Sequence, residues 1–93
     1  MIVAFATALF LAQTYYTPEE AKGLFNQANE AYSRQDFRSA EEGFRKLCDK
    51  GFGGPDVWFN LGTTYLAQEK LGEAVLFLER ARRAAPPAAP WRR

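Results

Sequence analysis

The strongest constraint on the fold of this 93-residue chain is a pattern that occurs twice, with an offset of 34 residues. Apart from Gln27, every position of both copies holds an apolar residue, glycine or proline. The later copy consists of Trp58, Leu61, Gly62, Tyr65, Ala74, Leu78, Ala81 and Pro86, and the earlier copy of Leu24, Gln27, Ala28, Ala31, Ala40, Phe44, Leu47 and Phe52. A period of roughly 20–50 residues is typical of arrays in which one small supersecondary unit stacks on the next.

The order of small and large residues from Trp58 to Pro86 resembles the tetratricopeptide repeat, a helix–turn–helix unit that stacks into a solenoid. The first copy departs from that pattern at Gln27, where an apolar residue is usual, and at Phe52, where a proline is usual. The resemblance assigns structural roles within the repeats to Ala28, Ala40, Trp58, Leu61, Gly62, Tyr65, Ala74, Ala81 and Pro86.

This resemblance implies an all-α chain, a tetratricopeptide-type solenoid of two repeats with an apolar segment at its N-terminus. The repeats are expected over residues 18–52 and 55–86, with a Pro/Ala/Arg tail over residues 87–93. Small residues let the two helices of a pair approach closely, and we expect Trp58 to lie in the core beside them. Ala81 is expected to contact whatever follows the second repeat.

Capping residues mark the expected start of the first helix. Thr17 can cap it, Pro18 fits its first position, and Glu20 is placed to complete a capping box. Asp36 can cap a second helix in the same way. We expect the first helix to extend to about Arg34.

Glycine and proline mark the other expected helix boundaries. The second helix should end at Gly51, because glycine readily adopts the left-handed conformation of a helix end. The third should begin near Pro55 and the fourth near Leu71. The fourth should end near Ala85, since proline cannot continue a helix.

Composition argues against catalysis. The formal net charge is +1, there is no histidine, and Cys48 is the single cysteine. These counts give no strong field for nucleic acid and leave no set of ligands for a structural zinc, no intrachain disulfide, and no base for a serine or cysteine nucleophile. We therefore expect a non-catalytic protein that uses no metal or cofactor.

Residues 1–14 are almost entirely apolar and carry no charge. Their length suits the apolar region of a secretory signal peptide, but no Lys or Arg precedes them. Two interpretations stay open: a signal peptide, or an apolar helix that packs on the first repeat. The first predicts an exported protein, periplasmic or associated with the inner membrane. The second allows a cytoplasmic one.

In a tetratricopeptide array the first helices of successive repeats line a groove. The residues expected to face it are Lys22, Phe25, Asn29, Tyr32, Asp56, Phe59, Asn60 and Thr63. Asn29 and Asn60 resemble two asparagines of the clamp with which some cochaperones hold a C-terminal carboxylate, but the cations of that clamp are missing here. Asn60 could equally bond the backbone within its own repeat. The aromatic residues favour an extended or helical apolar segment as the ligand.

A closer resemblance rests on several short runs. They are Ala31-Tyr32, Asp36-Phe37-Arg38-Ser39-Ala40-Glu41, Lys46-Leu47 with Gly51, Trp58-Phe59-Asn60-Leu61-Gly62, and residues 71–81. Together they resemble the tetratricopeptide protein of bacterial aerotolerance (Bat-type) operons. That family implies a role in an envelope complex, at or near a membrane.

Two functions follow from these patterns. The first is a protein-interaction module that binds a peptide or a partner domain in the groove. The alternative is a structural self-association module, or a fragment of a longer solenoid, because two repeats are few and no capping helix follows Ala81. In the alternative, Leu71, Leu78 or Ala81 is expected to be partly uncovered. The arginines near the C-terminal end either contact an acidic partner or form a solvated helix end.

Overall fold

A computed structural model describes residues 16–89 of the chain, and this part folds into four α-helices with no strand. The helices are α2 (Pro18–Ser33), α3 (Phe37–Asp49), α4 (Pro55–Ala67) and α5 (Leu71–Ala84). All four begin at the predicted residues, and α2, α3 and α5 end within about two residues of the predicted ends. The predictions for residues 1–14 and 90–93 lie outside the described residues.

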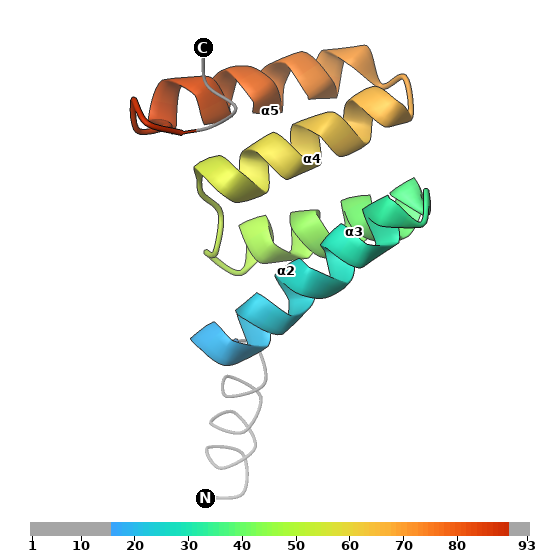
Figure 1. The fold of residues 1–93 in the computed structure, drawn as a ribbon, viewed down its shortest axis with the longest axis vertical. Coiled ribbons are helices and arrows are strands. Elements are labelled where there is room, and N and C mark those ends of the chain that lie inside the picture. The colour runs from blue at the N-terminus through green and yellow to red at the C-terminus, as the bar shows by residue number, and fades with distance from the viewer. Residues whose placement is uncertain (1–15, 90–93) are drawn as a thin grey trace, which may run out of the picture.

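The helices form two hairpins stacked on one another (Figure 1). Helix α2 packs on α3, and α4 packs on α5. Helices α3 and α4 join the two hairpins, while α2 and α4 also touch, over a smaller area. The order along the stack therefore follows the order along the chain.

Local hydrogen bonds explain where the first two of these helices begin. The Thr17 hydroxyl accepts from the Glu20 amide at 3.1 Å, and the Glu20 carboxylate accepts from the Thr17 amide at 3.4 Å, so the capping box is complete. The Asp36 carboxylate accepts from the Ser39 amide at 3.3 Å at the start of α3. Hydrogen bonding from the Ser39 side chain, and then from its amide, lowers the pKa of Asp36.

The two hairpin turns have the same geometry, 34 residues apart. Gln35 and Glu69 both adopt a left-handed backbone, with φ of 64° and 60°. In each turn the amide that follows donates back to the last turn of the preceding helix: Asp36 to the Ala31 carbonyl at 2.8 Å, and Lys70 to the Tyr65 carbonyl at 2.9 Å. The sequence repeat is thus also a repeat of backbone conformation.

The ends of α3 and α5 differ. Gly51 follows α3 with φ of 84°, a conformation that suits glycine. At the equivalent position after α5, Ala85 is extended, with ψ of 141°. The following Pro86 disfavours a helical conformation for the residue before it. The predicted role of Pro86 in ending the helix agrees with this geometry.

The core runs through both hairpins and includes most of the predicted structural residues. Ala40, Phe44, Leu61 and Ala74 are almost completely buried. The small residues mark close approaches, as predicted: a Cβ atom added at Gly62 would lie 2.7 Å from Cγ of Leu78. In the first hairpin the closest approach of this kind is at Gly43, which the sequence analysis did not single out, and there an added Cβ would lie 2.9 Å from Cβ of Ala28.

Two predictions about packing are wrong. Ala81 is completely buried, because it lies seven residues after Ala74 on the side of α5 that packs on α4. Trp58 is only half-buried, because it lies at the edge of the core, between Gly53 and the guanidinium of Arg80. The expectation that Leu71, Leu78 or Ala81 is partly uncovered is met by the first two, since Leu71 is exposed and Leu78 is half-buried.

Candidate peptide-binding face

The residues predicted to line a groove lie on α2 and α4, and one hydrogen bond links the two sets. The side-chain amide of Asn60 on α4 donates to the side-chain oxygen of Asn29 on α2 at 2.8 Å. The Asn60 side chain therefore bonds across the stack, and the alternative in which it bonds backbone within its own repeat is wrong. We call the side of the protein where these asparagines meet the α2/α4 face.

The backbone around Asn60 is held by two threonines. Thr63 and Thr64 both donate their hydroxyl hydrogens to the Asn60 carbonyl, at 2.9 and 2.6 Å. The Thr64 side chain is completely buried, and this bond satisfies its hydroxyl. Thr63 was predicted to face a ligand, whereas here its hydroxyl serves the backbone of α4.

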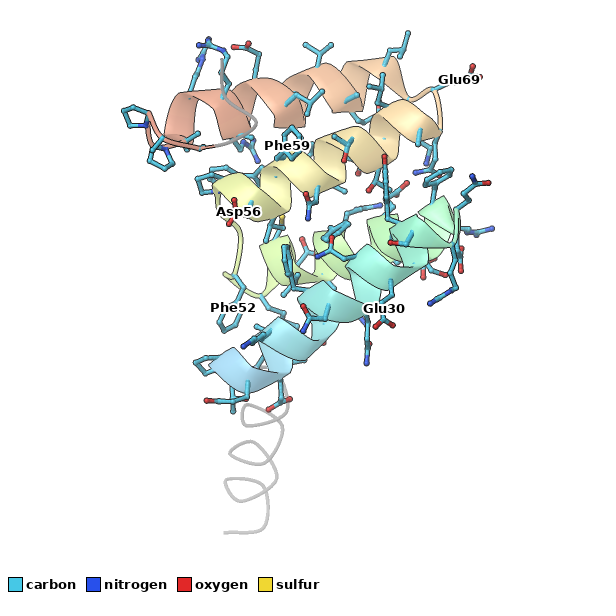
Figure 2. All side chains as sticks on the ribbon, in the orientation of Figure 1. Glu30, Phe52, Asp56, Phe59 and Glu69 are labelled. Atoms are coloured by element: carbon cyan, nitrogen blue, oxygen red, sulfur yellow. The ribbon has the colours of Figure 1, made fainter. Side chains whose placement is uncertain are left out.

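The aromatic residues of the α2/α4 face are less available than predicted. Phe25 packs edge-on against Phe44, with ring centroids 5.9 Å apart, and so belongs partly to the core. Tyr32 packs edge-on against Phe37 at 5.2 Å but keeps 38% of its surface exposed. Phe59 is half-buried and points toward α5 in Figure 2. Of the three rings, Tyr32 is the most open to a ligand.

Charged and apolar side chains complete this face. Lys22 on α2 and Asp56 in the first turn of α4 are both exposed, and Figure 2 shows Asp56 at the end of α4 where the helix begins. Leu66 is 50% exposed and lies three and seven residues after Thr63 and Phe59, on the same side of α4. The face thus combines an asparagine pair with exposed apolar surface and one charge of each sign.

A buried carboxylate, not predicted from the sequence, connects α3 to the second hairpin. Glu41 keeps only 8% of its surface exposed. Its carboxylate accepts hydrogen bonds from Gln68 at 2.8 Å, Lys70 at 3.0 Å and Arg45 at 3.4 Å. A signal for it exists in the sequence, because Glu41 lies on the same helical stripe as Phe37, Phe44 and Cys48.

Opposing effects set the pKa of Glu41. Burial disfavours the charged form and would raise the pKa, but hydrogen bonds from Lys70, Gln68 and Arg45 favour the carboxylate, and the net result is a lowered pKa. Glu41 is therefore ionised at neutral pH and fully paired, which is the arrangement that a buried charge requires. Its neighbour Glu42 is exposed, as expected for adjacent helical residues.

Two cavities lie away from the asparagine pair. One, of about 660 Å³, is lined by Trp58, Val75, Leu76, Glu79, Arg80, Arg83 and Ala84. Another, of about 450 Å³, lies beside Glu41 and is lined partly by Leu61, Tyr65 and Phe77. Neither cavity is lined by a residue of the α2/α4 face.

Cys48 is half-buried beside α4. Burial raises the pKa of its thiol, and the carboxylate of Asp49 acts in the same direction. Within residues 16–89, no three His, Cys, Asp or Glu side chains are grouped closely enough to hold a metal ion.

None of the four described helices is both long enough and apolar enough to span a bilayer. Comparison with known proteins gives no relative: no family model matches the chain, and neither does any curated protein or any solved structure.

Proposed function

We propose that this protein is a non-catalytic interaction module of the tetratricopeptide type, which binds a peptide segment on the α2/α4 face. The observation that carries the proposal is the asparagine pair at the junction of the two hairpins. The bond between the two side chains uses the oxygen of Asn29 and the amide of Asn60. Among the described residues, the amide of Asn29 and the oxygen of Asn60 make no hydrogen bond.

These two groups match the hydrogen-bonding pattern of a peptide backbone. An amide NH₂ can donate to a peptide carbonyl, and an amide oxygen can accept from a peptide N–H. Both asparagines are only half-buried, so a ligand can reach them. The Asn29–Asn60 bond fixes their positions before the ligand arrives, which lowers the entropic cost of binding.

Exposed apolar surface beside the asparagines favours an apolar ligand. Tyr32 and Leu66 keep 38% and 50% of their surfaces exposed. A segment with apolar side chains would bury these groups, while Lys22 and Asp56 contact its charged or polar ends. An extended or helical apolar segment is the class of ligand that this combination favours.

The sequence resemblances extend the proposal to the cellular setting. Likeness to the tetratricopeptide protein of Bat-type operons favours a bacterial envelope complex, with residues 1–14 directing export. On this proposal the protein acts in the periplasm or at the inner membrane. A cytoplasmic site is the alternative, to be separated by sequencing the N-terminus of the protein isolated from each compartment.

A random twelve-residue peptide library displayed on phage would test the binding function. Enriched peptides would be titrated into the full chain and their affinities measured by fluorescence anisotropy. Tyr32→Ala combined with Asn29→Ala is expected to weaken binding roughly thirtyfold, which corresponds to about 2 kcal/mol for an interface hot spot.

Arg38→Ala provides the control, because Arg38 is exposed on α3 and outside the α2/α4 face. Its affinity for the same peptides should equal that of the parent chain. Equal binding by all three proteins, or no enrichment of any peptide, would contradict a peptide-binding function for this face.

A further inference from the structure

Helix α5 leaves an unusual amount of apolar surface open. Leu71 and Val75 keep 60% and 62% of their surfaces exposed, and Leu76 keeps 53%. The three lie within six residues of one helix, whereas most other large apolar residues of residues 16–89 are at least half-buried. The hollow of about 660 Å³ beside Trp58 includes Val75 and Leu76 in its lining.

The internal repeat shows what this surface corresponds to. On α3, Glu41, Phe44 and Cys48 are covered, and Glu41 and Cys48 lie beside Leu61 and Tyr65 of α4. Thirty-four residues later, the equivalent positions are Val75, Leu78 and Arg82 on α5. We call the exposed residues Leu71, Val75 and Arg82, together with the part of Leu78 that α4 leaves uncovered, the open face of α5. It is the counterpart of the surface on which α3 holds α4.

A second copy of this chain does not fit the open face by continuing the stack. The residues with which α4 meets α3 include Val57 and Leu61, and their counterparts on α2 are Gly23 and Gln27. Glu30, on the same side of α2, points away from the other hairpin in Figure 2 and forms an ion pair with Arg34 at 4.0 Å. This side of α2 is polar and would leave the apolar surface of α5 poorly matched.

The charges on α5 indicate in which direction a docked helix would run relative to α5. Arg80, Arg82 and Arg83 lie in the last part of α5, and Glu79, which pairs with Arg82 at 2.9 Å and Arg83 at 3.6 Å, offsets only part of their charge. A helix lying antiparallel to α5 would place its first turn beside these arginines. Acidic residues are favoured in a helical first turn by the helix dipole as well, so both effects select the same chemistry.

We propose that the open face of α5 docks an amphipathic helix of a partner protein. The helix lies antiparallel to α5, carries apolar residues at i, i+4 and i+8, and has an acidic first turn. Helix α4 has this pattern, with Asp56 in its first turn followed by Val57, Leu61 and Tyr65. The partner helix therefore occupies on α5 the place that α4 occupies on α3. This site is separate from the α2/α4 face and does not depend on peptide binding there.

A peptide copied from residues 54–67 of this chain is the probe; it omits Gln68 and Lys70, the α4-side donors to Glu41 at the α3/α4 junction. The peptide would carry Phe59→Lys and Thr63→Asp, and a lactam between the two new side chains would hold it helical. Positions 59 and 63 are chosen because they lie away from the side of α4 that meets α3. The peptide would be titrated into the ¹⁵N-labelled full chain. Amide shifts in α5 are expected. A Val75→Glu chain should bind at least about tenfold more weakly, because the docked helix would bury the new carboxylate.

Matched variants separate this site from general effects. Asn26→Glu adds the same charge at an exposed position of α2 and should leave the affinity unchanged. A peptide with Asp56→Asn should bind several-fold more weakly to the parent chain but lose little with an Arg82→Gln chain. Leu71→Ser serves as a second test of the face if Val75→Glu lowers the helical signal in circular dichroism.

Three results would overturn the proposal. The first is the absence of binding at millimolar peptide, and the second is equal affinity of the parent, Val75→Glu and Leu71→Ser chains. The third is a dimer, detected by light scattering, that Val75→Glu dissociates, since a second copy of the chain would then occupy the face. Amide shifts confined to α2 and α4 would contradict the proposal in the same way as equal affinities, because the peptide would then bind away from α5.

Discussion

Replacing Gly62 by alanine tests the packing of the second hairpin directly. A Cβ atom at this position would lie 2.7 Å from Cγ and 2.8 Å from Cδ2 of Leu78, and 3.1 Å from its backbone nitrogen. The side-chain contacts could be relieved by a change of rotamer. The contact with the backbone nitrogen requires α4 and α5 to separate, so relief of the clash disturbs the whole hairpin.

The expected free-energy change is the sum of two opposing effects. Adding a methylene to a well-packed contact costs about 1–3 kcal/mol. Alanine is favoured over glycine within a helix by about 1 kcal/mol, which offsets part of that cost. The Leu78 backbone cannot rotate away, so the steric cost should lie in the upper part of its range, about 2–3 kcal/mol. After the offset of about 1 kcal/mol, we expect Gly62→Ala to lower the free energy of unfolding by about 1–2 kcal/mol. For a domain of this size that is a fall in melting temperature of roughly 5–15 °C.

Gly23→Ala is the matched control, since Gly23 also lies inside a helix but an added Cβ there would meet no atom within 4 Å. It should raise the free energy of unfolding by up to about 1 kcal/mol. Urea unfolding followed by circular dichroism measures both variants. The difference between them isolates the steric cost, and a Gly62→Ala chain that is stabilised as much as Gly23→Ala would refute the close approach of α4 and α5.

Two further predictions concern the residues around this hairpin. Glu41→Gln should lower the free energy of unfolding by about 1–2 kcal/mol at pH 7. This value is at the low end for a buried charge because solvent screens the partly exposed side chains that pair with Glu41. Because the folded-state pKa of Glu41 lies below its ordinary value of 4.5, its contribution is complete above that value and is lost as the pH falls through the folded pKa; a difference between parent and variant that stays constant from pH 7 to pH 2 would contradict the pairing. Trp58→Ala should cost about 1.5–2.5 kcal/mol, roughly half of the value for a fully buried tryptophan, and urea unfolding that shows a loss above about 4 kcal/mol would place the indole in the core.

The helix boundaries were predictable because local chemistry sets them. Thr17, Asp36 and Pro55 act through groups only a few residues away, and Gly51 and Pro86 act through their own backbone restrictions. Such signals are complete within the sequence. The left-handed conformations of Gln35 and Glu69 were not predicted, because neither residue type demands them, and the need arises only when two helices must reverse direction within a short turn.

The site was harder to predict because its geometry depends on how the hairpins stack. Asn29 and Asn60 were both candidates, but the bond between them follows from the closeness of α2 and α4, which no local pattern reveals. The same holds for Glu41, whose partners Gln68 and Lys70 lie in another hairpin. Ala81 was misplaced because the helical period alone does not say which side of a terminal helix is covered.

Glu41 lies where α3 packs on α4, and its counterpart Val75 lies on the open face of α5. The difference between these two residues affects which helix can pack at each place. At the internal junction, a buried carboxylate must find hydrogen-bond donors, and Gln68 and Lys70 supply them in one register only. An unmatched helix would leave Glu41 unpaired, at a cost of several kcal/mol. Val75 needs no hydrogen-bond donor, so on our proposal the open face of α5 binds any amphipathic helix whose apolar side fits it. The arginines of α5 then set the orientation of that helix. A Val75→Glu chain should then recover peptide binding when the peptide is extended to residue 70 and so includes the two donors Gln68 and Lys70; failure of that rescue would contradict the equivalence of Val75 and Glu41.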